Sequence, residues 1–329
     1  MTPLRIVYFG TAAFAVPPLK ALIAAPDKAE VVAVVTKPDQ PVGRKGELRS
    51  SPVAQAARDS LVPVLQPTTL KDEITQGELA ALRADLFIVA AYGKIVPKAM
   101  LKLPRLGCLN LHGSILPKYR GASPIQAAID AGETETGVTL MVMDEQIDHG
   151  PMLATVSTPI DPTDTYGSLE TKLANAAAEM LVTHLEDLSL GKLAAKEQEH
   201  DAATFTKIIK REDGFVAWAE LDGPAIERRR RAFDPWPGLY AVWMRKGAPV
   251  RLKLLDVCAI KGRPEAKPGS AFVGADGIPA IAAREGAVSL LQVQPEGKKP
   301  MTGQAFLNGY PDFKDAVLEL SDPAAPKAP

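Results

Sequence analysis

The chain has 329 residues, of which 46% are hydrophobic and 23% are charged. This composition is typical of a globular protein, and the length exceeds one ordinary hydrophobic core, which predicts two domains. Two cysteines, Cys108 and Cys258, exclude a disulfide framework and fit a reducing compartment. No apolar run reaches the roughly 20 residues of a membrane span. The N-terminal residues lack the pattern of a leader peptide, so we expect a cytoplasmic protein.

The net charge of −1 hides an asymmetry along the chain. Residues 1–205 carry 19 Lys+Arg and 24 Asp+Glu, a net of −5, whereas residues 206–329 carry 19 and 15, a net of +4, and the two sum to −1. A basic C-terminal part indicates contact with a polyanion, although charge of this size is also common on solvated surfaces.

The first part of the chain alternates apolar runs with helical patterns, which is typical of a parallel sheet covered by helices. The expected strands are Arg5–Gly10, Val31–Thr36, Leu86–Ala91, Gly107–His112 and Gly137–Met143. The expected helices are Pro17–Ala24, Pro52–Asp59, Leu79–Arg83, one that begins at Ser123-Pro124, and Thr165–Leu188. We therefore predict a Rossmann-like α/β domain with a mostly parallel sheet over residues 1–190.

The pattern changes after residue 190. Residues 191–211 are polar and predict a linker. Over residues 212–320, a helix at Pro224–Phe233 precedes short strands separated by turns, which predicts a small OB-like β-barrel. The expected strands are Tyr240–Arg245, Val250–Val257, Ala271–Val273, Ile278–Ala283 and Val288–Val293. Residues 321–329 are rich in Pro and Ala and predict a disordered tail.

Two polar residues end a buried strand of the first part. Asn110 and His112 stand two apart, so their side chains point to the same side, and Gly113 ends the strand. Polar side chains at the carboxyl end of a strand occupy the edge where open α/β sheets keep their active sites. Alternatively, both side chains bond only to loop backbone.

Acidic residues follow the next strand. Asp144, Glu145 and Asp148 come directly after Gly137–Met143, and we expect them at the same edge as His112. A carboxylate there would orient the His112 ring and help to move a proton, whereas the alternative for a loop acid is solvation. His149 either acts electrostatically on Asp148 or faces solvent.

Common nucleotide and metal motifs are absent from the sequence. The strand that ends in Gly10-Thr11 is not followed by Gly-x-Gly-x-x-Gly, and there is no P-loop and no Cys/His metal spacing. A conventional NAD enzyme and a metal site are therefore disfavoured.

Taken together, the motifs resemble the folate-dependent formyltransferases, and within them the branch that acts on methionyl-tRNA. The matching motifs are Phe9-Gly10-Thr11, Lys37–Pro41 with Gly43-Arg44, Ala91-Tyr92-Gly93, Asn110-Leu-His112, Ser114–Gln126, Asp148, Phe233–Pro237 and Gln294–Met301. The resemblance covers nearly the whole chain. It implies a formyltransferase domain followed by a tRNA-binding barrel, with Asn110, His112 and Asp148 as the catalytic triad.

The resemblance also implies the ligands. The formyl donor would be 10-formyltetrahydrofolate, held at Ser114, Ile115, Leu116, Pro117, Tyr92 and Gly93, with no metal. The acceptor would be initiator methionyl-tRNA, contacted by Arg44, Lys45, Lys298 and Lys299. The run Arg228–Arg231 either joins the tRNA contact or pairs with acids of the chain. We expect a monomer that does not bind membranes.

Three alternatives share part of this pattern. A sugar- or purine-precursor formyltransferase and a 10-formyltetrahydrofolate hydrolase would use the same Asn/His/Asp centre. They are disfavoured by the long loop after His112, the Lys37–Ser51 insertion and the basic C-terminal part. A catalytically silent RNA-binding protein would not require the triad.

Overall fold

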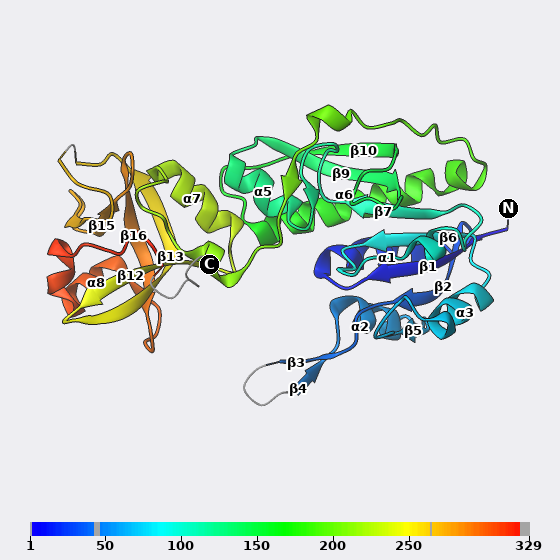
Figure 1. Ribbon diagram of the computed structural model, residues 1–329, viewed down its shortest axis with the longest axis horizontal. Helices are drawn as coiled ribbons and strands as arrows, with labels where there is room; N and C mark the ends of the chain where they lie inside the picture. The colour runs from blue at the N-terminus through cyan, green and yellow to red at the C-terminus, as the bar shows by residue number, and fades with distance from the viewer. Residues whose placement is uncertain (1, 43–46, 264, 323–329) are drawn as a thin grey trace. The chain divides into compact units, whose positions relative to one another are not determined.

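A computed structural model describes residues 2–42, 47–263 and 265–322 of the chain (Figure 1). The chain divides into two compact units. The first is made of Met1–Ile125, Thr134–Ile160 and Ser168–Lys207, and the second of Gln126–Glu133, Asp161–Gly167 and Ile208–Pro329. Within the described ranges, no helix is both long and apolar enough to cross a membrane.

The first unit is built on a seven-stranded sheet in the order β10-β9-β7-β6-β1-β2-β5. Its strands are β1 (Leu4–Gly10), β2 (Ala29–Val35), β5 (Val64–Leu65), β6 (Leu86–Ala90), β7 (Cys108–His112), β9 (Glu135–Val142) and β10 (Met152–Pro159). Short strands β3 (Gln40–Val42) and β4 (Glu47–Arg49) form a hairpin, and β8 (Arg120–Gly121) pairs with β11 (Phe205–Thr206). The helices are α1 (Val16–Ile23), α2 (Pro52–Asp59), α3 (Glu73–Ala81), α4 (Lys98–Leu101), α5 (Pro124–Ala131) and α6 (Tyr166–Ser189). α5 and α6 each have residues in both units.

Five neighbouring strands of this sheet are parallel, as predicted, but β9 is antiparallel to β7. In their register His112 lies opposite Thr139 and Leu109 opposite Val142. The loop after β9 therefore leaves beside the amino end of β7. β9 therefore does not end beside His112, as a parallel strand would, but the loop after it still brings Asp148 to His112.

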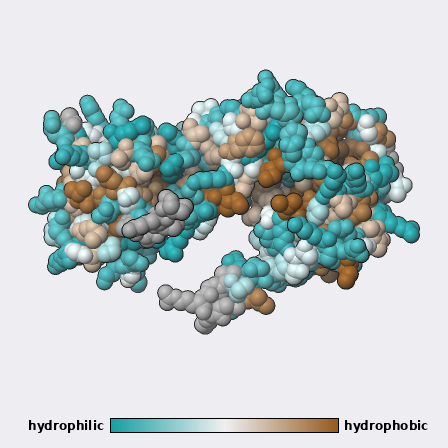
Figure 2. Space-filling model, viewed as in Figure 1, coloured by the Kyte–Doolittle hydropathy of each residue, from teal (hydrophilic) through white to brown (hydrophobic). Residues whose placement is uncertain are grey.

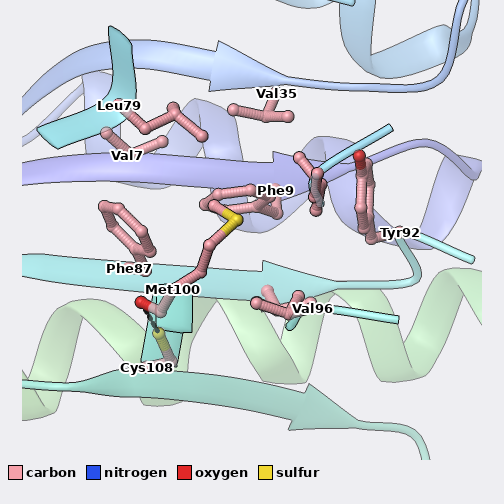
Figure 3. Packing of buried hydrophobic residues seen from close by; sticks show 11 residues of the cluster. Val7, Phe9, Val35, Leu79, Phe87, Tyr92, Val96, Met100 and Cys108 are labelled. Carbon is pink, nitrogen blue, oxygen red and sulfur yellow. Dashed lines mark hydrogen bonds between the residues drawn. The ribbon is translucent and has the colours of Figure 1, made fainter. Parts of the chain in front are cut away.

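A cluster of buried hydrophobic residues packs on one face of the sheet and supports the carboxyl ends of β1 and β6 (Figure 3). Phe9 contacts Phe87 and Tyr92, with ring centroids 5.2 and 5.5 Å apart. The thiol of Cys108 at the start of β7 lies 3.7 Å from the carbonyl oxygen of Met100 in α4. Aromatic packing of this kind stabilises a core beyond the area that it buries. The cluster thus fixes the segment that follows β6 against the amino end of β7.

The second unit contains a six-stranded antiparallel sheet. Its strands are β12 (Leu239–Arg245), β13 (Ala248–Ile260), β14 (Ala271–Val273), β15 (Pro279–Ala282), β16 (Ala287–Pro295) and β17 (Met301–Thr302), with helices α7 (Gly223–Ala232) and α8 (Gly303–Gly309). The sheet order is β12-β13-β16-β15-β14, and Leu318 bridges Trp243 on β12 while Val317 bridges Ser270 beside β14. The segment after α8 thus joins both edges of the sheet. Asp322 accepts a hydrogen bond from Tyr240, and residues 323–329 of the predicted tail lie outside the described residues.

The consecutive arginines of α7 bind other parts of the second unit. Arg229 forms a bidentate ion pair with Asp130, with nitrogen–oxygen distances of 3.1 and 2.9 Å, and Arg228 donates to the Asp130 carbonyl. Arg231 donates to the carbonyl oxygen of Asp164 over 2.8 Å. These arginines are therefore paired within the chain, which was one of the two expectations for this run. These contacts tie the short segments around 130 and 164 to α7.

The surface of the molecule is mostly polar in the view of Figure 2, where hydrophobic residues gather in small separate patches. Exposed large apolar side chains do occur on the loops of the first unit, among them Ile95 and Ile147. Scattered exposure of this kind is normal for folded proteins.

Candidate active site

Asn110, His112 and Asp148 come together in the first unit. The amide of Asn110 donates to Oδ1 of Asp148 over 3.1 Å, and Nδ1 of His112 lies 3.5 Å from Oδ2 of the same carboxylate. Asn110 and His112 reach one carboxylate because residues two apart on β7 point to the same side. His112 is 5% exposed and Asp148 14% exposed in their side chains. The group is therefore shielded from water on most sides.

Asp148 adopts an unusual backbone conformation, with a φ of 49°. A non-glycine residue in this region is strained by about 1–3 kcal/mol and persists only where its surroundings hold it. One such contact is the backbone amide of Gly121, which donates to Oδ2 of Asp148 over 2.8 Å. Gly121 itself has a φ of 108°, which favours glycine. The loop after His112 and the loop after β9 are thus joined through the carboxylate.

The second ring nitrogen of His112 fixes the protonation pattern of the ring. Its Nε2 lies 2.9 Å from the carbonyl oxygen of Tyr119. A carbonyl oxygen only accepts, so Nε2 must carry a hydrogen and donate. Nδ1 is then an acceptor in the neutral ring, and it carries a proton only in the imidazolium form, where it donates to Asp148. The arrangement can hold or release one proton at Nδ1.

The loop Ser114–Pro117 is anchored by Thr139 of β9. The Thr139 hydroxyl donates to the carbonyl oxygen of Ser114 over 2.8 Å and accepts from the backbone N–H of Leu116 over 3.1 Å. Ser114 and Leu116 are buried, while Ile115 and Pro117 are partly exposed. Of the four residues in this loop that are expected to hold the donor, Ile115 and Pro117 offer accessible side chains.

Tyr92 and Gly93 follow β6. Tyr92 is 2% exposed and packs in the cluster of Figure 3, where burial raises the pKa of its hydroxyl to about 12. Gly93 has a φ of 72°, and a Cβ built on it would lie 2.5 Å from Nζ of Lys37. Only a residue without a side chain allows Lys37 to approach the backbone here. Tyr92 therefore contributes packing and backbone to this edge rather than an accessible hydroxyl.

Of the four residues expected to contact tRNA, the structure describes two. Arg44 and Lys45 lie outside the described residues. Lys298 and Lys299 are exposed on the turn after β16 in the second unit, where Gln294 donates to the Lys298 carbonyl over 2.8 Å.

Sequence reasoning missed two residues that contact the loops of the site, Gln198 and Arg120. Gln198 was part of an expected linker, yet it is 4% exposed and donates to the carbonyl oxygens of Asp148 and Gly150. Arg120 is 3% exposed and donates to Oε1 of Gln198. His200 is exposed, and its Nδ1 lies 2.9 Å from Nη2 of Arg120. A polar segment carries no periodic signal, so only the folded chain reveals these contacts.

His149 contacts Asp144 and His200. Its Nδ1 lies 2.6 Å from Oδ2 of Asp144, and its ring stacks on that of His200 with centroids 4.1 Å apart and an interplanar angle of 6°. Within the described ranges, no group of three His, Cys, Asp or Glu side chains is arranged to hold a metal ion.

Comparisons with known proteins place the chain in a family. A formyl transferase family model matches residues 4–185, and a model of the formyl transferase C-terminal domain matches residues 208–311. The methionyl-tRNA formyltransferase of Roseiflexus sp. (strain RS-1) is 44% identical over 330 residues, which cover 97% of this chain and 98% of that protein. The methionyl-tRNA formyltransferase of Chloroflexus aurantiacus (strain ATCC 29366 / DSM 635 / J-10-fl) is 42% identical over 307 residues, covering 93% and 97%. The chain belongs to the formyl transferase family, which confirms the resemblance seen in the motifs.

Solved structures agree with the expected fold. The N-formyltransferase of Helicobacter canadensis, in complex with folinic acid and dTDP-3-aminofucose, has a TM-score of 0.61 and 19% identity over 88% of this chain and 99% of that chain. HypX of Aquifex aeolicus in complex with tetrahydrofolic acid has a TM-score of 0.58 and 18% identity, and it covers 92% of this chain. This chain spans about half the length of HypX, 47%. The α/β domain followed by a β domain is therefore confirmed as a formyltransferase fold.

Proposed function

We propose that this protein transfers a formyl group from 10-formyltetrahydrofolate to the α-amino group of methionine on initiator tRNA, and so supports translation initiation. The observation that carries the proposal is the contact of Asn110 and His112 with the Asp148 carboxylate. The chain in which it occurs is 44% identical, over 97% of its length, to a methionyl-tRNA formyltransferase.

Asn110 is suited to stabilise the developing negative charge. Attack of the amino nitrogen on the formyl carbon forms a carbon–nitrogen bond and moves an electron pair onto the formyl oxygen. Preorganised N–H donors are the usual means of stabilising such an oxyanion. The Asn110 amide carries two N–H groups, of which one donates to Asp148, so its orientation is fixed before the substrate binds.

His112 and Asp148 are suited to move the proton. The attacking nitrogen becomes positively charged and must lose a proton, which Nδ1 of His112 can accept directly or through a water. The imidazolium so formed would lie between two acceptors, the Asp148 carboxylate 3.5 Å from Nδ1 and the Tyr119 carbonyl 2.9 Å from Nε2. The proton would then pass to N10 of the folate as the bond between N10 and the formyl carbon breaks. Protons and electrons balance without a covalent intermediate on the enzyme.

The ligand contacts belong to the same proposal. The folate would lie along Ile115 and Pro117 and the backbone of Ser114, Leu116, Tyr92 and Gly93. Arg44, Lys45, Lys298 and Lys299 would contact tRNA phosphates, since Lys and Arg supply most of the affinity for a nucleic-acid backbone. We further propose that the enzyme acts in the cytoplasm as a monomer.

The test is to incubate the purified protein with 10-formyltetrahydrofolate and methionyl-initiator tRNA and to measure formyl-methionyl-tRNA. Wild type should form product and His112→Ala should not. His184→Ala is the matched control, because His184 lies on α6 and donates to the carbonyl of Met180 in its own helix. Formate release without tRNA would instead indicate a hydrolase, and transfer to an amino sugar or a purine precursor would move the acceptor to those classes. Equal product with His112→Ala would overturn the proposed centre.

A further inference from the structure

The segment Lys196–Thr206, here called the strap, lies along both loops of the site. Lys196 and Met152 at the start of β10 exchange two backbone hydrogen bonds of 2.8 Å. Further along, the backbone N–H of Arg120 donates to the Thr204 carbonyl over 2.8 Å, and β11 pairs with β8 in parallel. The strap is thus joined by backbone to the start of β10, which follows the loop that holds Asp148, and to the loop that follows His112.

Gln198 is the side chain through which the strap reaches Asp148. Its Nε2 donates to the carbonyl oxygen of Asp148 over 3.0 Å and to that of Gly150 over 2.7 Å. The first of these bonds is made to the residue with the strained φ of 49°. Since strained conformations persist only where the surroundings over-determine them, a buried amide that holds this carbonyl and the one two residues later is suited to this purpose.

Arg120 fixes the orientation of the Gln198 amide. Nε and Nη2 of Arg120 donate to Oε1 of Gln198 over 3.1 and 2.7 Å. A guanidinium only donates, so the oxygen of the amide must face it and the NH2 group must face Asp148. Nη2 also lies 2.9 Å from Nδ1 of His200, which must then accept. The His200 ring is stacked on His149, the residue next to Asp148.

We propose that Gln198, oriented by Arg120, is a positioning residue for the formyl transfer, because it holds the backbone of Asp148 so that the carboxylate faces Asn110 and His112. The inference rests on the proposed role of Asp148. Neither Gln198 nor Arg120 reaches the reacting atoms through these contacts, so both act through Asp148. The amide donor of Gln198 is the group on which the effect depends.

Gln198→Glu separates positioning from folding. A glutamate keeps the acceptor for Arg120 and strengthens it by charge, but it has no N–H for the two carbonyl oxygens. Two buried carbonyl oxygens lose their donor, so we expect the melting temperature to fall while the variant still folds. Because a misplacement of about 1 Å can cost roughly 10²-fold in rate, we expect kcat to fall by about that factor. KM for methionyl-initiator tRNA should stay within about twofold, since binding contacts common to substrate and transition state are kept.

The control on the same strap is Glu197→Gln, because Glu197 is the exposed neighbour of Gln198 and should leave kcat unchanged. The split between kcat and KM is the second readout. A displaced Asp148 no longer faces His112, so kcat should fall in Gln198→Glu at a nearly unchanged KM, and both should stay at the wild-type value in Glu197→Gln. A merely structural role of Gln198 would leave kcat unchanged in a variant that folds.

Asp148→Asn separates the inference from the proposed function. A wild-type kcat in Gln198→Glu, together with an inactive Asp148→Asn, would overturn the role of Gln198 and leave the proposed function standing. An active Asp148→Asn would overturn both. If Gln198→Glu does not fold, the variants Arg120→Lys and Arg120→Met test the role of Gln198 instead. Lysine keeps one donor to Oε1 and should retain more of kcat than methionine, and a wild-type kcat in Arg120→Met would contradict the proposal.

Discussion

The amide nitrogen of Asn110 lies 3.1 Å from Oδ1 of Asp148, so the residue proposed to stabilise an oxyanion is held by the carboxylate proposed to assist proton transfer. This shared contact sets the orientation of the second N–H of the amide. Asn110→Leu keeps the approximate volume and removes both donors. Loss of one oxyanion donor costs about 10²–10³-fold in kcat, and we expect a fall of this size in single-turnover formation of formyl-methionyl-tRNA.

Asn175→Leu is the control for this substitution, because Asn175 is exposed on α6 and the side-chain change is the same. It should leave kcat at the wild-type value. A kcat for Asn110→Leu within twofold of wild type would contradict the proposed role of the amide.

Gly121 is the position at which a single methyl group should disturb the site. A Cβ on Gly121 would lie 2.5 Å from the carbonyl oxygen of Thr206, while the Gly121 amide donates to Asp148. We expect Gly121→Ala to push the strap from the loop and to lower kcat by about 10²-fold, the cost of a misplacement near 1 Å. Gly107→Ala is matched to it, because Gly107 also has a positive φ, 77°, but has no atom within 4 Å of its Cβ position. Gly107→Ala also places an alanine at a positive φ but without the collision, so steady-state kcat of folded Gly107→Ala should be close to wild type.

Thr139 is expected to stabilise the fold through two buried hydrogen bonds. Thr139→Val leaves the Ser114 carbonyl and the Leu116 N–H without the hydroxyl that now contacts both. Unsatisfied buried groups cost about 1–3 kcal/mol each, so the free energy of unfolding should fall by about 1–3 kcal/mol or more. Thr139→Ser keeps the hydroxyl and should be destabilised less. Equilibrium unfolding in urea measures both variants, and a Thr139→Val variant as stable as Thr139→Ser, or more stable, would contradict the proposed role of the hydroxyl.

Much of the fold could be predicted from the periodicity of hydrophobic residues and from the Gly and Pro residues that end strands and helices. The strand expected at Gly107–His112 is β7, Cys108–His112, because an apolar run that ends in Gly113 has few other interpretations. The helix expected at Leu79–Arg83 instead spans Glu73–Ala81, since Asp72 caps it by accepting from the N–H of Thr75. Its early residues are polar and hide the helical pattern. Local capping could have located this start.

The direction of β9 and the contacts of the strap could not be predicted in the same way. A buried strand reads as the same apolar run in either direction, so the sequence did not indicate that β9 is antiparallel to β7. Gln198 lies in a polar stretch, and its proposed role depends on a hydrogen bond to the carbonyl of Asp148, 50 residues earlier in the chain. Long-range polar contacts of this kind depend on tertiary packing. The catalytic candidates were identifiable because Asn, His and Asp side chains can donate hydrogen bonds or transfer protons. The residues that position them have no such distinguishing residue type.

Salt dependence should distinguish the basic residues of the second unit. Removal of one phosphate-binding side chain makes the slope of log affinity against log salt shallower by about 0.7–0.9. If Lys298 and Lys299 contact tRNA, Lys298→Gln and Lys299→Gln should each reduce the slope by about this amount in filter binding. Arg229→Gln should leave the slope unchanged, because Arg229 is paired with Asp130 within its own unit. A reduced slope in Arg229→Gln, or an unchanged slope in both lysine variants, would contradict this assignment.

The two cysteines should differ in reactivity. Cys258 is exposed, whereas Cys108 lies in the core and burial raises the pKa of its thiol to about 12. Only the thiolate reacts, so one equivalent of a thiol reagent should label native protein at pH 8, at Cys258, and a second should enter after unfolding.

The stability of the fold should also depend on pH through Cys108. The unfolded chain releases the Cys108 proton near its ordinary pKa of about 8.5, whereas the folded chain keeps this proton up to a pKa of about 12. The stability conferred by the buried thiol is therefore present below about pH 8.5 and is lost as the pH rises from about 8.5 to about 12. Cys108→Ala should therefore show a smaller loss of unfolding free energy between pH 8 and pH 10 than wild type, and Cys258→Ala should show the wild-type loss. Labelling of both thiols in native protein at equal rates would contradict the burial of Cys108.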